Sequence, residues 1–548
     1  MSSKFIKGAV ILSASLFFVR LIGFLYIIPF GNMVGQAGLA LYGYAYVIFS
    51  SLITLSGLGI PAGIAKFVSK YNTQKEYDVS RKMFRYGMIF MVFLGIFAFL
   101  IMYAGAPWFA YRALGGTDMV NTVEDVTMAI RMVSFALIIF PPMSIMRGFF
   151  QGNQDMAPTA ISQLLEQIVR IALIIIGSFI VIYMIGGTIQ QAVNISVFAA
   201  FIGTLCSLIV LNRSWVKKKP EFDDLLLRTV DHPPRSTKKL FLELISYALP
   251  FAVLSLIANA FQFIDMMTFN RFLLNAGVPK EIAEATFGIY NTSLSKIIMI
   301  PVSFAIAFGQ SLIPEITERI QNKNPKGVNK TMGTAIMLTS FITVPAVIGM
   351  WLLSKPIFVM LFNEGPELNY IGGAIFGRGA FIALFMALNA ILDAIMQGIG
   401  KQYDALKFLA IGIIIKIIGN IILIPVFYAN GAIYATILAF TACIVLKVLV
   451  LRKTTGLETR KVAKRHLLIF IISTIMAISV WIVTLGLNQI FDYTVSRGQA
   501  SMYVLVAGMT GVMVYAGLAI YFDIAKMFFG ERMSAENVKR RFMKLIKR

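Results

Sequence analysis

The chain has 548 residues, of which 58% are hydrophobic and 14% charged, and its mean hydropathy is +0.79. This composition excludes a soluble globular protein and is typical of an integral membrane protein. A net charge of +23 would suggest a nucleic-acid partner only if the basic residues formed a patch on a soluble fold, and their placement along the chain argues against one.

In chain order, about fourteen apolar stretches are long enough to cross a bilayer, for which roughly 20 residues are needed. The first follows the segment MSSKFIKG without a small-residue cleavage site, so we expect it to be retained as a membrane helix. The predicted spans are centred near Phe17, Phe49, Val92, Ala136, Ile174, Phe201, Leu256, Val302, Ile342, Phe385, Ile414, Ala439, Ile475 and Met513.

Basic residues gather in alternate connections between these spans. If the N-terminus is cytoplasmic, the outer segments hold only Arg112, Arg271, Lys280, Lys355 and Arg497. This bias follows the positive-inside rule and predicts an even number of crossings with both termini in the cytoplasm. The basic charge is therefore explained by topology in a cell membrane, without nucleic acid. The tail KRRFMKLIKR (539–548) is predicted to lie on anionic lipids of the inner leaflet.

An internal repeat divides the chain. Gln151-Gly152 is followed nineteen residues later by Arg170-Ile171, and Gln397-Gly398 is followed nineteen residues later by Lys416-Ile417. Two parallel six-helix lobes with a binding site at their interface would account for this spacing. The predicted parts of this all-α integral membrane protein are an N-lobe (1–212), a cytoplasmic basic linker (213–238), a C-lobe (239–452), two further helices (453–525) and a basic amphipathic tail (526–548).

Six ionisable residues lie inside predicted spans: Arg20, Glu166, Arg170, Asp265, Lys296 and Lys416. Such groups normally face a protein interior or an aqueous cavity and mark a substrate or ion path. We therefore interpret the chain as a transporter with an excess of positive charge in a central cavity. Glu166 and Arg170 are one helical turn apart and can pair, either as a structural ion pair or to hold Arg170 ready for cargo. Asp393, near the inner end of its span, is expected to pair with a loop lysine.

The sequence leaves the driving force open. Asp265 is the best candidate for a Na⁺ or H⁺ site, with Asn420 as a candidate neighbour. Lys416 shares a helix face with Asn420, and a lysine there could replace a bound cation. Alternatively, the membrane potential acts on the positive residues without any ion site. No nucleotide-binding or metal-ligand motif is present in the sequence, so we expect no cofactor and no metal.

Several segments resemble one transporter family. They are KFVSKYN (66–72), SRKM (80–83), RMVSFALI (131–138), RGFFQGNQDMAPTAISQLLEQIVRI (147–171) and IPVSFAIAFGQSLIP (300–314). Together they resemble the Gram-positive MurJ-like flippases of the YtgP type, relatives of the stage V sporulation protein B group within the MOP exporter superfamily. The resemblance implies a flippase that moves lipid II, or a related undecaprenyl-pyrophosphate-linked oligosaccharide, to the outer leaflet for peptidoglycan synthesis.

The resemblance also assigns roles to parts of the chain. It implies two six-helix lobes around a cationic cavity, with a groove for the lipid tail formed by the last two helices. We expect the chain to work by alternating access and as a monomer. Arg20 and Lys296 resemble the cavity residues of the first and eighth helices. Tyr26-Ile27 and Ser51-Leu52 stand where Gram-negative members carry an Arg-Asp pair and an arginine pair. A mechanism that relies on those groups therefore does not transfer.

The charges fit this cargo and leave alternatives. A polyprenyl pyrophosphate carries about two negative charges, and Arg20, Arg170, Lys296 and Lys416 can neutralise them during the crossing. Charge does not distinguish sugars, so a teichoic-acid, polysaccharide or spore-cortex precursor remains an alternative. A cation-coupled multidrug exporter of the same superfamily would rely on acidic residues, which the basic excess disfavours. A lipid-modifying enzyme would need a catalytic cluster, and none is visible.

Overall fold

A computed structural model of the chain describes residues 22–524 except 24, 58, 234, 457 and 458, together with residue 526. Arg20, the first predicted span and the predicted basic tail segment 539–548 lie outside the described residues. All regular elements in the described part are helical. The chain forms two compact units, Met1–Thr292 (unit 1) and Ser293–Arg548 (unit 2), which are described separately.

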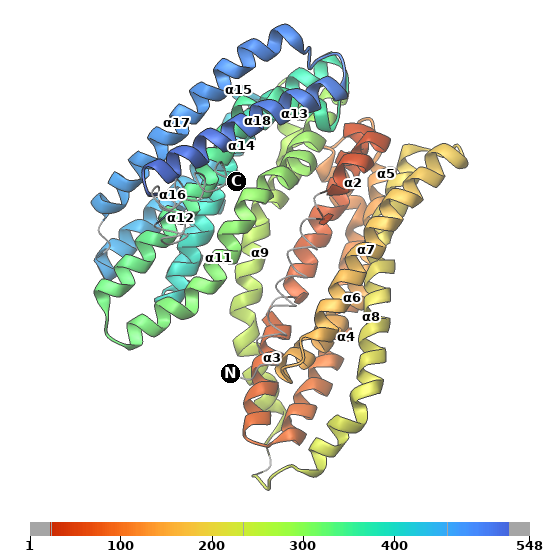
Figure 1. Ribbon diagram of the computed structural model, residues 1–548. Helices are drawn as coiled ribbons and strands as arrows, with labels where there is room; N and C mark the ends of the chain where they lie inside the picture. Colours follow the sequence, from red (N-terminus) through yellow and green to blue (C-terminus); the bar gives the residue numbers. More distant parts are fainter. Residues whose placement is uncertain are drawn as a thin grey trace, which may run out of the picture. The chain divides into compact units, whose positions relative to one another are not determined.

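Unit 1 is a helical bundle, and Figure 1 labels its helices from α2 to α9. Its central helix is α2, which packs against all the helices from α3 to α10 in the unit, and Gly35 breaks α2 with a positive φ of 67°. A core of apolar residues joins α3, α4, α6, α8 and α9. The elements are α2 (Ile27–Gly57), α3 (Gly59–Thr73), α4 (Tyr77–Ala113), α5 (Val123–Ser134), α6 (Ala136–Gly152), α7 (Ala157–Phe179), a π-helical turn (Ile180–Met184), α8 (Ile189–Leu227), α9 (Thr237–Asn275) and α10 (Lys280–Phe287).

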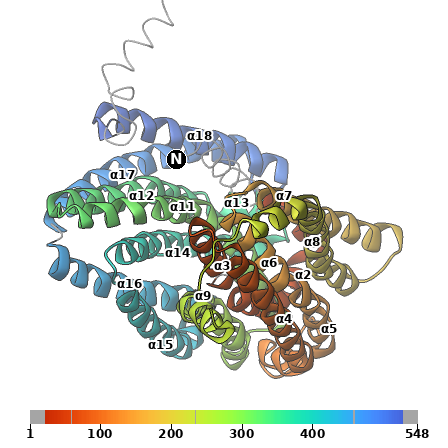
Figure 2. The ribbon, with the colours of Figure 1, turned by 90° about the horizontal axis from the view of Figure 1, so that it is seen from below.

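Unit 2 is built around α14, which packs against α11, α12, α13, α15 and α16. A π-helical stretch (Gly288–Leu294) leads into the unit. Helices α17 and α18 lie side by side and pack on α12 and α13, as Figures 1 and 2 show. The elements are α11 (Ser295–Gln321), α12 (Pro325–Leu352), α13 (Ser354–Leu361), α14 (Pro366–Gly398), α15 (Gln402–Phe427), α16 (Ala429–Thr455), α17 (Thr459–Ile490) and α18 (Arg497–Tyr521).

The helices have the surfaces of membrane spans. Twelve of them, within the described residues, are long and apolar enough to cross a bilayer. Phe93, Phe97 and Met513 are between 61% and 66% exposed on such helices, which suits lipid better than water. The predicted class, an all-α integral membrane protein, is confirmed. Of the two remaining predicted spans, the first lies mostly outside the described residues and the seventh corresponds to α9.

Polar residues begin several helices, because the first backbone N–H groups of a helix have no partner within it. The Thr122 and Thr188 side chains accept from the third residue of α5 and α8, and both form complete capping boxes. Ser496 caps α18 in the same way, at a distance of 3.3 Å from the Gln499 N–H. These caps satisfy backbone groups where the chain turns between spans.

The internal repeat is visible in local backbone structure. The α6–α7 turn has three hydrogen bonds, Asn153 N to Phe149 O, Gln154 N to Gln151 O and Asp155 N to Phe150 O. The α14–α15 turn has the same three bonds 246 residues later, Ile399 N to Ile395 O, Gly400 N to Gln397 O and Lys401 N to Met396 O. Gln154 and Gly400 both have positive φ, 59° and 76°. The two halves therefore share this corner, as the spacing predicts.

Two structural features bear on the predicted domain boundaries. Helix α8 continues to Leu227, through the first part of the predicted linker 213–238. Helix α9, expected to begin the C-lobe, belongs to the compact unit 1, where it packs against α2, α3 and α4. The lobe boundaries follow the internal repeat in the sequence, whereas the unit boundaries follow contacts between residues in the structure. The two divisions therefore describe different properties of the chain.

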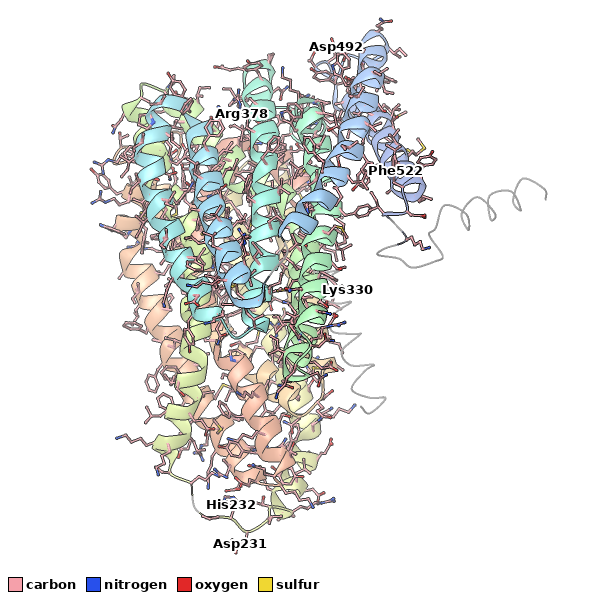
Figure 3. All side chains as sticks on the ribbon, turned by 90° about the vertical axis from the view of Figure 1, so that its left-hand side faces the viewer. Asp231, His232, Lys330, Arg378, Asp492 and Phe522 are labelled. Carbon is pink, nitrogen blue, oxygen red and sulfur yellow. The ribbon has the colours of Figure 1, made fainter. Side chains whose placement is uncertain are left out.

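The segment between α8 and α9 is attached to one end of unit 1, where Figure 3 labels Asp231 and His232. The His232 Nε2 atom lies 2.7 Å from Asp78 Oδ1. Arg235 donates from two nitrogens to the two carboxylate oxygens of Glu76, each at 2.8 Å. The hydrogen bond with Asp78 raises the pKa of His232. This segment is therefore held to the start of α4 by two acid–base contacts.

A buried carboxylate organises the α4–α5 connection of unit 1. Glu284 on α10 is fully buried and accepts from the backbone N–H groups of Val120 and Asn121, at 2.8 and 3.0 Å. It also accepts from Asn121 Nδ2 at 2.9 Å. A carboxylate can accept several hydrogen bonds at once, which compensates its burial. Glu284 thus fixes this loop to α10.

Candidate functional site

The Arg170 side chain projects from α7 toward a row of three tyrosine rings on α2 and just before its start. Its guanidinium carbon lies 5.9 Å from the centre of the Tyr46 ring on α2. Tyr46 stacks on Tyr42 at 5.5 Å, and the hydroxyl of Tyr42 lies 3.1 Å from that of Tyr26. The Arg170 Nε atom is buried without a hydrogen-bond partner among the described residues. The arginine is thus oriented by aromatic rings and retains donor capacity.

Glu166 does not pair with Arg170, so the predicted ion pair within α7 is wrong. Glu166 accepts from Arg147 Nη2 on α6 at 2.7 Å instead. Arg147 also donates to Ser207 on α8 at 2.7 Å and to Ser162 on α7 at 3.1 Å. The arginine joins three helices, with only 10% of its side chain exposed. Nothing in the sequence spacing of Arg147 indicates this network.

Asp265 is buried in α9 and accepts a hydrogen bond of 2.8 Å from the Tyr290 hydroxyl. The Tyr290 ring stacks on Phe269, one helical turn beyond Asp265, at 5.4 Å between ring centres. Asn259, on the same helix, donates to Thr54 on α2 at 2.8 Å. An acidic group is therefore buried inside unit 1 and hydrogen-bonded to a tyrosine of the π-helical stretch.

In unit 2, Lys416 and Asn420 lie on α15 and are both fully buried. The Lys416 ammonium donates to the Ala432 carbonyl at 2.9 Å and to the Thr436 hydroxyl at 2.7 Å, both on α16. Lys296 is the second residue of α11, follows the π-helical stretch and is partly buried. π-Helical segments occur frequently at functional sites. The structure therefore places two of the predicted basic residues inside unit 2, on different helices.

Asp393 pairs with a lysine of a membrane helix, and the expected pairing with a loop lysine is wrong. Lys447 on α16 is fully buried, and its Nζ atom lies 2.5 Å from Asp393 Oδ1 and 2.6 Å from Asn389 Oδ1. Sequence reasoning missed Lys447 completely. One signal was available: Asp393 stands 246 residues after Arg147, at the equivalent position of the repeat. Each unit therefore has an ion pair at this position of the repeat. The residue at the position is the base in unit 1, Arg147, and the acid in unit 2, Asp393.

The charges of these residues differ between the units. In unit 1, Arg147 and Arg170 balance Glu166 and Asp265. In unit 2, the three lysines at 296, 416 and 447 outnumber Asp393, which leaves two positive charges. No group of three or more His, Cys, Asp or Glu side chains in the described part of the chain could hold a metal ion. These side chains are suited to binding an anion or moving a proton, and none forms a catalytic cluster.

The family model "Polysaccharide biosynthesis protein" matches residues 5–319, and the model "MatE" matches residues 250–422. The chain is 37% identical over 534 residues to "Lipid II flippase MurJ" of Bacillus subtilis (strain 168), covering 97% of this chain and 98% of the relative. It is 25% identical over 425 residues to "Stage V sporulation protein B" of the same organism, covering 75% and 76%.

Among solved structures, the chain has the fold of "Lipid II flippase MurJ, inward closed conformation". The TM-score is 0.66 at 17% sequence identity, and the match covers 94% of this chain and 98% of that one. At this identity the similarity establishes the fold alone, whereas the family assignment depends on the sequence matches.

Proposed function

The chain belongs to the MurJ family of lipid II flippases, within the MOP superfamily, and from this membership we propose that it moves lipid II from the inner to the outer leaflet. It is a multi-pass membrane transporter and not an enzyme. The observation that carries the proposal is the 37% identity to the Bacillus subtilis lipid II flippase over 97% of this chain. Transport would proceed by alternating access and supply peptidoglycan synthesis.

Arg170 is the side chain we propose for binding the pyrophosphate within unit 1. Its planar guanidinium can donate two parallel hydrogen bonds to phosphate oxygens, which a lysine cannot do. Because Glu166 forms its ion pair with Arg147 at 2.7 Å, the acid on the same helix does not occupy the donors of Arg170. The Tyr46 ring orients the guanidinium without forming an ion pair. Arg20 and Lys296 would supply further positive charge along the path.

Lys416 has a different proposed role because its ammonium already has oxygen partners. The bonds to Ala432 O and Thr436 Oγ1 hold it between α15 and α16. We propose that it contributes a fixed positive charge to unit 2 and contacts the cargo only if these helices move apart. Coupling to Na⁺ or H⁺ is proposed at Asp265, with Asn420 as a further polar group. Movement of positive residues through the membrane field would add about 2.3 kcal/mol per charge per 100 mV.

The test uses bacteria depleted of their own lipid II flippases. Wild-type chain, Arg170→Ala, Arg170→Lys and Lys296→Ala are expressed at equal levels, and an external enzyme that cleaves lipid II reports the amount in the outer leaflet. We expect restoration by wild type, loss in both alanine variants, and partial activity for Arg170→Lys because the charge remains without the fork. Arg131→Ala is the matched control, since Arg131 also lies over a tyrosine ring, that of Tyr103 at 5.0 Å.

The outcomes separate cargo from site. If an inserted, well-expressed wild-type chain does not restore outer-leaflet lipid II, the proposed cargo is wrong. Another polyprenyl-linked glycan is then the next cargo to examine. If wild type and Arg170→Ala restore it equally, the cargo stands and Arg170 has no part in binding.

A further inference from the structure

A cavity of about 520 Å³ opens at one end of unit 2, where five helices begin or end. Helices α11, α14 and α16 end there, and α12 and α15 begin there. In Figure 3, the labelled Lys330 of α12 marks this end of the unit, and Arg378 lies toward the other. The positive-inside rule assigns this end to the cytoplasm. The volume lies within the usual range of roughly 300–1,000 Å³ for small-ligand sites.

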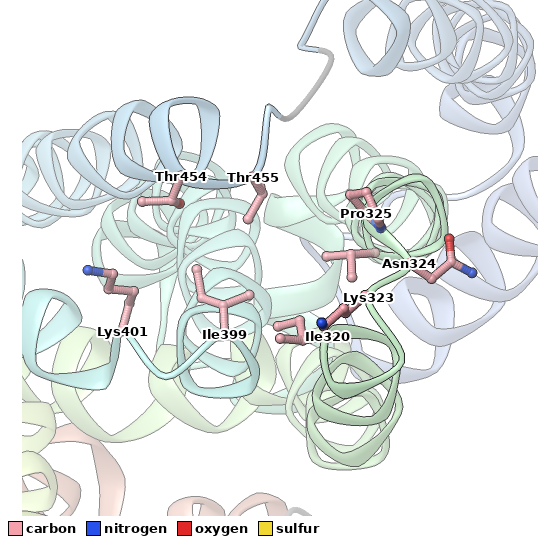
Figure 4. Close-up of a pocket in the computed structure, with 9 residues that line it drawn as sticks. Ile320, Lys323, Asn324, Pro325, Ile399, Lys401, Thr454 and Thr455 are labelled. Atoms are coloured by element: carbon pink, nitrogen blue, oxygen red, sulfur yellow. The ribbon is translucent and has the colours of Figure 1, made fainter.

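The lining combines positive charge with an apolar wall, as Figure 4 shows. Lys323 and Lys401 come from different turns, α11–α12 and α14–α15, and stand on opposite sides of the cavity. Ile320 and Ile399 form an apolar wall of the cavity between the two lysines. A site with cationic groups beside apolar surface suits an amphiphile that carries an anionic group, because each part of the ligand meets a matching surface.

Electrostatics at this end favours an anion. Lys401 and Lys407 lie 4.0 and 3.5 Å from the same carboxylate, that of Asp404. With Lys323, these four side chains sum to a charge of +2. The helix dipoles contribute little net potential here, because the partial negative charges of three helix C-termini oppose the partial positive charges of two N-termini. The lysines therefore determine the sign of the potential.

The hydroxyl groups of the lining are arranged as acceptors. Thr454 donates to Val450 O at 2.8 Å, and Thr455 donates to Leu451 O at 2.6 Å. Their protons are therefore directed into α16, and their oxygens can accept from the hydroxyls of a polyol such as glycerol. The lysine ammonium groups are the corresponding donors for phosphate oxygens.

We propose that this cavity binds the headgroup of an anionic phospholipid of the inner leaflet, with the phosphate between Lys323 and Lys401. The glycerol hydroxyls of the headgroup face Thr454 and Thr455, and the start of the acyl chains lies on the isoleucines. This site is separate from the proposed cargo residues and does not depend on the proposed transport. Its occupation would link α11, α14 and α16 through one ligand.

The experiment measures lipid binding to the purified full-length chain in a neutral detergent. Short-chain phosphatidylglycerol is titrated against wild type, Lys323→Ala/Lys401→Ala and the matched control Lys326→Ala/Lys330→Ala. The control removes two exposed lysines of α12 that do not line the cavity. We expect the first double variant to raise the dissociation constant about 25-fold, from roughly fivefold for each lysine near an anionic headgroup. The control should change it less than twofold.

Three comparisons can overturn the proposal. An equal loss of affinity in the two double variants would show that binding depends on diffuse surface charge. Equal binding of phosphatidylcholine, or of glycerol 3-phosphate without acyl chains, would exclude an anionic lipid site. Tighter binding of a short polyprenyl pyrophosphate, lost in Lys323→Ala/Lys401→Ala, would assign the cavity to the cargo. Thermal unfolding of each variant checks that the fold is retained, and none of these readings requires transport.

Discussion

The buried pair Arg147–Glu166 gives a quantitative test of how unit 1 is held together. Arg147→Met would leave the Glu166 carboxylate without its partner, 2.7 Å away in the native structure. Removal of one member of a buried pair costs about 3–5 kcal/mol. The side chains are 10% and 18% exposed, so we expect the lower end, about 3 kcal/mol. Glu166→Leu should cost less, about 2 kcal/mol, because two serines still accept from Arg147.

The double variant Arg147→Met/Glu166→Leu removes both charges together. We expect it to cost only about 2 kcal/mol, because an apolar pair can replace a buried ion pair with little loss. The coupling energy between the two positions is then about 3 kcal/mol, the upper end of what contacting residues show. The assay is the free energy of unfolding of the purified chain in mixed detergent micelles.

Two further measurements serve as controls for this coupling energy. Arg170→Met combined with Glu166→Leu should show a coupling below about 0.5 kcal/mol, since these residues do not pair. Arg228→Met is the exposed control: its side chain is 69% exposed, and its pair with Asp224 should contribute less than about 0.5 kcal/mol. Stronger coupling of Glu166 to Arg170 than to Arg147 would refute the structural reasoning and restore the pairing expected from helix spacing.

Three other predictions concern acidic groups of unit 1. Glu284→Ala should lower the free energy of unfolding by about 2 kcal/mol, because the N–H groups of Val120 and Asn121 lose their acceptor. Glu284→Gln should lower it less, and an unchanged free energy of unfolding in Glu284→Ala would contradict the role of Glu284 in fixing this loop. The raised pKa of His232 means that its bond to Asp78 is strongest below pH about 6.5 and weakens as the pH rises through the raised value; proteolysis of the segment between α8 and α9 should increase with pH, and His232→Gln should abolish this dependence. Asp265→Asn should weaken any Na⁺ or H⁺ dependence of transport, and an unchanged dependence would place coupling elsewhere.

The sequence alone was sufficient for the properties that depend on local pattern. The length of an apolar run decides whether a helix can cross a bilayer, so the class and nearly all of the spans could be predicted. The repeat that joins Gln151-Gly152 to Gln397-Gly398 was found from spacing, and the structure places the same short turn after each pair, because residues close together in the chain code for it. The family was recognisable for the same reason, since its motifs are contiguous segments.

The tertiary structure decided which charges meet. Glu166 and Arg170 are neighbours on one helix, yet Arg147 reaches Glu166 from α6 at 2.7 Å. Lys447, which sequence reasoning did not single out, is buried by α14 and bound to Asp393. Spacing along one helix shows only which side chains share a face. The partner of a charge in a low-dielectric interior is set by whichever opposite charge a neighbouring helix brings within hydrogen-bond distance, and that depends on how the helices pack.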